Sequence, residues 1–390
     1  MFPNPQSALP LPPRPSIEHY RKLAKELLKV YKSGGEVSEF ARRRLSVKCV
    51  LAEAQFVIAR SHGFLSWPKF VKHLECLRKS SPVSRFEAAV DAIVDGDVAT
   101  LKQLLREDPQ LIRATSTREH GATLLHYVSA NGVENYRQKT PPNILGITEL
   151  LLHTGAEIDA TADVYGGGCT ALGLAATSVH PERAGVQEAL LQKLLDHGAK
   201  LEQPSIAGHG QSIIVSCLAN GRPKAAEFLA SRGARFDFAG AAGLGRLDVV
   251  KSLFDDATKE RRDHGFLYAC GYGRNSVVEF LLGNNADLLA KRGDGQTPLH
   301  MAVIGGHLET VKLLLRQNAP LEVTNRYGGT VMGQAGWSAA HGGDPDVYIA
   351  ILEALFGAGA KIPERHTPVN TPVDAWMAAH GSRAEPSWHA

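Results

Sequence analysis

Several features that mark particular classes of protein are scarce or missing in this chain of 390 residues. Its 5 cysteines are widely spaced and form no Cys-x-x-Cys pair, so the sequence indicates neither a disulfide framework nor a zinc site. The net charge of +3 is too small for a chain of this size to favour nucleic acid or a membrane surface as partner. No apolar run approaches the roughly 18 residues that a membrane helix needs. We therefore expect a cytoplasmic protein without metal, cofactor or membrane partner.

The N-terminus also lacks what a signal peptide requires, namely a basic start and an unbroken apolar run. Its prolines instead predict a solvated, proline-rich tail over residues 1–15. Residues 16–80 are predicted to form a bundle of three helices. Ser16 is a suitable N-cap for the first helix, the second is expected from about Ser38 to Arg60, and Ser66 caps the third.

Basic residues are in excess in the predicted bundle, with 14 Lys and Arg against 6 Asp and Glu. The run from Arg42 to Arg44 could contact phosphate, but the basic residues are scattered over all three helices without exposed aromatics between them. A solvated face is therefore the favoured interpretation, and nucleic acid is not expected as a partner. The string from Leu51 to Pro68 is similar to an N-terminal helical module of bacterial repeat proteins, which implies a domain boundary and no activity.

Beyond Pro82 the sequence repeats itself. Helix endings of the form Leu-Leu-x-x-(Gly/Asn)-Ala recur, and Gly or Asn there accepts the left-handed conformation that ends a helix. Their spacings range from 33 to 52 residues, and a period near 33 indicates a helical repeat array. The endings lie at Gly155, Gly198, Gly233, Asn285, Asn318 and Gly359.

The seventh repeat carries the most complete motif, Thr297-Pro298-Leu299-His300-Met301-Ala302 followed by Gly306-His307-Leu308-Glu309. This pattern resembles the ankyrin repeat, and Thr123-Leu124-Leu125-His126 echoes it in the second repeat. The resemblance implies an all-α ankyrin-repeat solenoid of about eight helix-pair units, in which His300 bridges neighbouring turns by hydrogen bonds. It also implies that the protein binds a protein partner.

Eight repeats are expected within residues 84–362, and residues 363–390 are expected to hold a capping helix, Pro372 to His380, and a tail. The repeats are predicted to start near Ser84, Glu119, Val164, Ile206, Asp237, Arg262, Gly293 and Arg326. Repeats four to six are short, so the run from Ala239 to Gly243 is expected to offer almost bare backbone to a ligand or to a neighbouring segment.

Three repeats carry insertions between their two helices: Glu134–Pro142, Ser178–Arg183 and Ser338–Asp346. Insertions cost ordering entropy, so three at one edge predict a use beyond stability. The third and eighth repeats also share a Tyr-Gly-Gly turn and a later histidine. From these features and from tyrosines of the sixth repeat we predict a set of binding residues. They are Tyr136, Arg137, Tyr165, His180, Arg183, Tyr268, Tyr272, Arg274, Tyr327, Trp337 and His341.

A non-enzymatic scaffold for protein–protein interaction is the favoured function. The alternative is an enzyme or receptor for a small anionic molecule, with His180, Glu182 and Tyr136 as candidate catalytic residues at the insertions of the second and third repeats. No motif in the sequence fixes a reaction. Arg137 and Arg183 are expected to be exposed, so replacing both should abolish binding and change stability by less than about 1 kcal/mol. A steep loss of stability would instead identify them as structural clamps.

Overall fold

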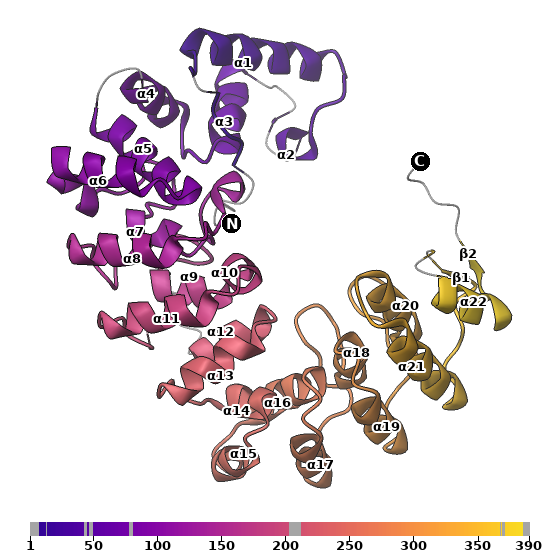
Figure 1. The fold of residues 1–390 in the computed structure, drawn as a ribbon. Helices are drawn as coiled ribbons and strands as arrows, with labels where there is room; N and C mark the ends of the chain where they lie inside the picture. Colours follow the sequence, from indigo (N-terminus) through magenta and orange to yellow (C-terminus); the bar gives the residue numbers. More distant parts are fainter. Residues whose placement is uncertain are drawn as a thin grey trace. The chain divides into compact units, whose positions relative to one another are not determined.

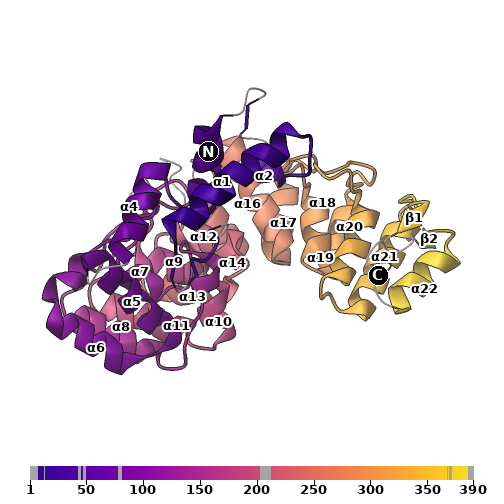
Figure 2. The ribbon, with the colours of Figure 1, turned by 90° about the horizontal axis from the view of Figure 1, so that it is seen from above.

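The computed structural model describes residues 8–12, 14–42, 45–46, 50–77, 81–202, 212–366, 368 and 371–384. It divides into two compact units, Met1–Ile213 with Asn220–Leu229 and Ile214–Ala219 with Ala230–Ala390. Both units are built almost entirely of helices, so the predicted all-α class is confirmed (Figures 1 and 2). Among the residues described, no helix combines the length and the apolarity that crossing a bilayer requires. Four predicted features lie outside the described residues: part of the proline-rich tail, Arg43 with Arg44, the start of the fourth repeat at Ile206, and the end of the C-terminal tail, residues 385–390. The prolines concerned are Pro3, Pro5 and Pro13.

The N-terminal helices pack around a small aromatic core that includes Tyr20 and Phe70. Ser16 caps the first helix by accepting a hydrogen bond from the His19 amide, as predicted. The prediction of a single helix from Ser38 to Arg60 is wrong. Leu45, Ser46 and Val50 lie outside any helix, and the carboxylate of Glu53, in a separate helix, accepts bonds from the backbone and hydroxyl of Ser46. The helices are α1 (Ile17–Lys32), α2 (Glu39–Arg42), α3 (Leu51–Ser61) and α4 (Trp67–Leu77).

The rest of the described chain contains eight successive helix pairs, which confirms the predicted solenoid. In the second unit, the first helices of successive pairs lie side by side in one row and the second helices in another (Figure 1). The pairs are α5 (Pro82–Asp95) with α6 (Val98–Glu107), α7 (Leu124–Tyr127) with α8 (Ile144–His153), α9 (Ala171–Thr177) with α11 (Gln187–Asp196), α12 (Ile213–Ala219) with α13 (Pro223–Ser231), α14 (Phe238–Leu244) with α15 (Leu247–Leu253), α16 (Lys259–Gly271) with α17 (Asn275–Gly283), α18 (Pro298–Ile304) with α19 (Leu308–Arg316), and α20 (Val331–Ala340) with α21 (Pro345–Gly357).

The recurrent helix endings adopt the conformation that the sequence predicts. All six have positive φ, including Asn285 at 59° and Asn318 at 57°, and this is the left-handed region that asparagine and glycine tolerate best. The motif histidines also behave as expected. His300 Nδ1 lies 2.8 Å from the Thr297 hydroxyl, and its Nε2–H donates to the Gly329 carbonyl of the next repeat at 3.2 Å.

Close backbone packing explains the glycine- and alanine-rich run in α14. A Cβ added to Gly243 would lie 2.6 Å from Leu218 Cδ1, and one added to Gly265 on the neighbouring α16 would lie 2.5 Å from Phe238 Cδ1. Neighbouring segments of the chain therefore occupy the space beside this run, which is one of the two predicted alternatives. At the C-terminal end, Val373 and Met377 of α22 (Thr371–Ala379) are buried, and β1 (Arg365–His366) pairs in parallel with β2 (Arg383–Ala384).

Candidate interaction surface

The insertion of the second repeat, which contains the short helix η3 (Asn135–Arg137), directs a charged side chain inward. Arg137 is only 6% exposed. Its guanidinium donates to Glu87 Oε2 and to Asp91 Oδ1, each at 2.7 Å, and both carboxylates belong to α5 of the preceding repeat. The expectation that Arg137 is an exposed binding residue is therefore wrong, because the carboxylates of α5 compensate its burial.

Arg118, which no sequence motif marks as a site residue, completes this arrangement. Its Nη1 lies 2.7 Å from Glu87 Oε1 and its Nε lies 2.8 Å from Glu134 Oε1. Glu87 thus bridges two guanidinium groups, and Glu134 has no exposed side-chain surface. We call Arg118, Arg137, Glu87 and Glu134 the ion cluster.

The ion cluster holds its carboxylates ionised despite their burial. Burial by itself raises the pKa of Glu134, but the positive charge of Arg118 and a hydrogen bond from His120 outweigh it, so the pKa lies well below its ordinary value. The nearby His73 stays neutral at physiological pH because burial lowers its pKa to about 4, against the opposing charge of Glu87.

The ion cluster lies where the N-terminal bundle meets the first repeats. The Glu119 amide donates to the Gly63 carbonyl at 3.0 Å, and the Glu119 carboxylate pairs with Arg60. The Arg118 guanidinium lies over the ring of Phe64, with 5.6 Å between guanidinium carbon and ring centroid. These contacts assign the ion cluster a structural role, joining the bundle to the array.

The predicted catalytic residues have separate partners. The half-buried Tyr136 accepts a long hydrogen bond of 3.4 Å from Arg118, whereas Glu182 on α10 (Val179–Arg183) pairs with Arg222. His180 is half-buried, and burial together with the charge of Arg183 lowers its pKa. Arg183 itself is exposed. The second predicted guanidinium, that of Arg137, is paired with carboxylates of the ion cluster and is not available to a ligand. The structure therefore does not support the predicted site for a small anionic molecule.

In the sixth repeat, the predicted binding residues hold the stack together. Arg274 Nε donates to the Gly243 carbonyl of the preceding repeat at 2.9 Å, and the Tyr272 hydroxyl donates to the Leu218 carbonyl. Tyr268 stacks on Tyr272 with 6.5 Å between ring centroids. These side chains lie half-buried between repeats, so little of them faces solvent.

The same kind of contact recurs in the next two repeats. His307 Nε2–H donates to the Gly271 carbonyl at 3.1 Å, and the Tyr348 hydroxyl donates to the Ile304 carbonyl at 3.0 Å. We call Arg274, His307 and Tyr348 the turn clamps. Arg274 and His307 directly precede the second helix of their repeat, and Tyr348 lies in the first turn of the second helix α21. Each ties this part of its repeat to the end of the first helix of the repeat before it.

The insertion of the eighth repeat is different, because it leaves an aromatic side chain exposed beside a hollow. Trp337 is 57% exposed and stacks on His341, with 4.0 Å between ring centroids and 19° between ring planes. Both belong to a groove with a volume of about 500 Å³. Its walls are the end of α18 with the two glycines that follow it, the end of α20, and residues Gly342–Asp344, Val347 and Tyr348. We call this the Trp337 groove.

The two Tyr-Gly-Gly turns also carry exposed aromatic side chains. Tyr327 is 79% exposed, and Tyr165 is 53% exposed while its hydroxyl donates to Asn131 Oδ1 at 2.8 Å. In both turns the threonine that follows, Thr170 or Thr330, caps the next helix. The turns therefore have a structural use, and their tyrosines are available as contacts at the hairpin ends.

Comparison with known proteins identifies the class to which this architecture belongs. A family model of ankyrin repeats in 3 copies matches residues 238–326 and 266–365. The chain is 38% identical over 73 residues to zebrafish Notch-regulated ankyrin repeat-containing protein A, 17% of this chain and 58% of the relative. It is 40% identical over 105 residues to zebrafish Notch-regulated ankyrin repeat-containing protein B, 25% of this chain and 87% of the relative. Chicken Inversin is 37% identical over 73 residues, 18% of this chain and 6% of Inversin.

The chain belongs to the ankyrin-repeat family, so the predicted ankyrin-repeat array is confirmed, and the predicted role of an interaction scaffold is consistent with this family. It spans only about half the length of the first of these relatives, and each match covers a quarter of this chain or less. The relatives are vertebrate proteins, which gives no support to the expected bacterial source of the N-terminal module.

Proposed function

We propose that this protein holds an extended segment of a partner protein in the Trp337 groove. The observation that carries the proposal is the exposed indole of Trp337, fixed by its stack on His341 at the edge of a hollow. Tryptophan contributes more binding energy than most residues at protein interfaces, above all where a pocket lies beside it.

The walls of the groove suit a peptide backbone with an apolar side chain. Gly305, Gly306, Gly342 and Gly343 line it. A Cβ added to Gly342 would meet no atom within 4 Å, so a second backbone can approach there, whereas Gly305 and Gly343 are already packed against His307 and Tyr348. Trp337 offers the apolar surface on which an aliphatic or aromatic side chain of the partner packs. A cytoplasmic location remains part of this proposal and agrees with free thiols at Cys76, Cys169 and Cys270.

A peptide selection tests the proposal. Peptides are selected from a random library on the immobilised full chain, and the affinity of the selected peptides is measured by fluorescence polarisation. Trp337→Ala should weaken binding at least tenfold, because it removes the anchor. Leu289→Ala is the matched control, since Leu289 is also an exposed apolar residue of the second unit, 52% exposed, and does not line the groove. Selected peptides that bind both variants as tightly as the natural chain would contradict the proposal.

A further inference from the structure

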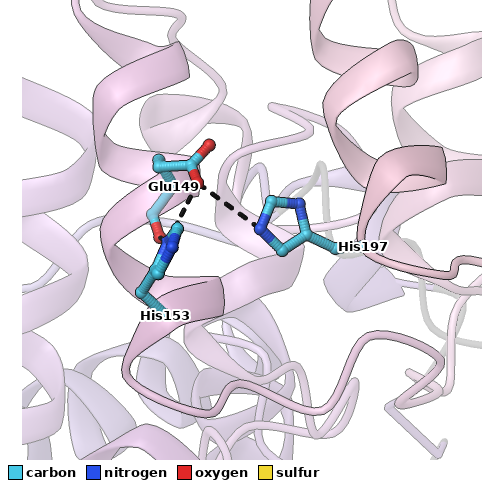
Figure 3. Close-up of side chains that lie close together, drawn as sticks. All are labelled: Glu149, His153 and His197. Carbon is cyan, nitrogen blue, oxygen red and sulfur yellow. Dashed lines mark hydrogen bonds and ion pairs between the residues drawn. The ribbon is translucent and has the colours of Figure 1, made fainter.

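A second site lies on the outer helices of the second and third repeats. Glu149 and His153 are one turn apart on α8, and His197 caps the C-terminal end of α11, the neighbouring second helix. The three side chains converge, as Figure 3 shows, although they come from different repeats. No assigned role of the protein uses them.

The distances between the side-chain ligand atoms are close to those of a metal site. Glu149 Oε1 lies 2.9 Å from His153 Nδ1 and 3.4 Å from His197 Nε2. All three ligand atoms lie within 4.8 Å of one another. Ligands bound tetrahedrally to Zn²⁺ at about 2.0–2.1 Å are about 3.3 Å apart. His153 Nδ1–H also donates to the Glu149 carbonyl at 3.0 Å, so metal binding requires this exposed ring to release that bond and change tautomer. The half-buried side chains of Glu149 and His197 need only small shifts.

The tautomer of His197 presents a lone pair to the carboxylate. Its Nδ1–H donates to the Lys193 carbonyl at 2.9 Å, so in the neutral ring Nε2 carries a lone pair that points at Glu149 Oε1. Two electron-rich atoms at this distance are favourable only when a cation, either a proton or a metal ion, lies between them. A backbone carbonyl that orients a histidine in this way is the usual outer shell of a zinc ligand.

Lys193 contacts the carboxylate on its other oxygen. Its ammonium pairs with Glu149 Oε2, which leaves Oε1 to the two histidines. The positive charge weakens metal binding through repulsion, while the ion pair holds the carboxylate in position. The cluster therefore contains one feature that favours a metal and one that limits its affinity.

We propose that Glu149, His153 and His197 form a surface zinc site that ties the second repeat to the third. Two imidazoles and a carboxylate are the ligands of an open zinc site, in which water or a donor atom of a partner takes the fourth position. The sequence predicts no metal site, and His153 and His197 belong to different repeats and match no zinc motif.

Cobalt titration of the purified full chain tests the proposal. Tetrahedral Co²⁺ absorbs visible light strongly, and Zn²⁺ should displace it in a 1:1 ratio. His153→Ala and His197→Ala should each weaken Zn²⁺ binding at least tenfold, and Glu149→Gln should weaken it less. Lys193→Gln keeps a hydrogen-bond donor but removes the positive charge, so it should bind Zn²⁺ several-fold more tightly. His19→Ala is the matched control, because it removes an exposed histidine on α1 of the same unit.

Two results would overturn the zinc site. One is no binding by the natural chain up to 1 mM Zn²⁺ at pH 7.5. The other is binding that His153→Ala and His197→Ala leave unchanged, which would locate the metal elsewhere. Hydrogen exchange provides a second readout, since Zn²⁺ should slow exchange in α8 and α11 together, and the helices should not respond in His197→Ala. Circular dichroism checks that each variant is folded.

Discussion

The insertions of the second and eighth repeats occupy the same position in the repeat and have opposite uses. Arg137 in the second repeat is buried among carboxylates, whereas Trp337 in the eighth is exposed beside a groove. The charged residue is thus buried and the apolar residue is exposed, which is the reverse of where these residue types usually lie. The comparison teaches that an insertion marks a place where the chain departs from the repeat, and only its neighbours determine whether that place binds a partner or supports the stack.

The largest effect should come from the ion cluster. Arg118→Met removes the nearest cation of the buried Glu134, which keeps only the more distant Arg137 at 3.7 Å, and takes one of the two guanidinium groups from Glu87. Removing one partner of a buried ion pair costs about 3–5 kcal/mol. We expect urea to unfold the first unit at a clearly lower concentration while the second unit changes little, since repeats are coupled mainly to their neighbours. Hydrogen exchange resolved by unit measures this. Equal protection of the first unit in both proteins would show that the ion cluster is not a clamp.

The next largest effect should be a loss of stability of the first unit at acid pH. Burial lowers the pKa of His73 and of His126 to about 4, so both stay neutral in the folded state below the ordinary value near 6.5. The unfolded chain binds these protons first, so the first unit should lose stability as pH falls from 6.5 to 4, by about 1.4 kcal/mol per pH unit for each group. Below about 4.3 the depressed pKa of Glu134 adds to the loss.

Urea midpoints of the first unit at pH 7, 5.5 and 4.5 provide the measurement. His73→Gln should flatten the dependence between pH 6.5 and 4, because it removes one of the two histidines whose pKa burial lowers to about 4. An unchanged slope in this variant would rule out His73 as a source of the acid sensitivity.

A turn clamp should matter less than the ion cluster. Tyr348→Phe removes the donor to the Ile304 carbonyl and keeps the ring, so the free energy of unfolding of the second unit should fall by about 1 kcal/mol. Thermal unfolding followed by circular dichroism measures it. No change in Tm would mean that water replaces the hydroxyl as donor without cost.

The smallest effects are expected at the exposed residues. Trp337→Ala and Arg183→Ala should each change the free energy of unfolding by less than about 0.5 kcal/mol. For Arg183 the small change in the free energy of unfolding that the sequence predicted still stands. For Arg137, which is buried among carboxylates, we now expect a large loss of stability. Chemical denaturation of the two variants beside the natural chain checks this, and a large loss in Trp337→Ala would make the indole part of the core.

The repeat boundaries could be predicted because their signals are local. A helix that ends at Gly155 or Asn318 needs the left-handed conformation at that residue whatever surrounds it. In the same way, the Thr297-to-His300 motif fixes a cap and a hydrogen bond within one turn. Glu87 carried a weaker signal that was missed, since this carboxylate stands directly between the apolar residues Phe86 and Ala88 of an amphipathic helix.

The sequence by itself therefore determined the class of fold, the eight helix pairs and the edge that carries the insertions, because each follows from contacts between residues close in the chain. Only the tertiary structure decided that Arg137 meets Glu87, that Arg274 clamps Gly243 and that His197 meets Glu149. These residues belong to different repeats. Their contacts depend on how the side chains of one repeat meet those of the next, which no periodicity in a single sequence specifies.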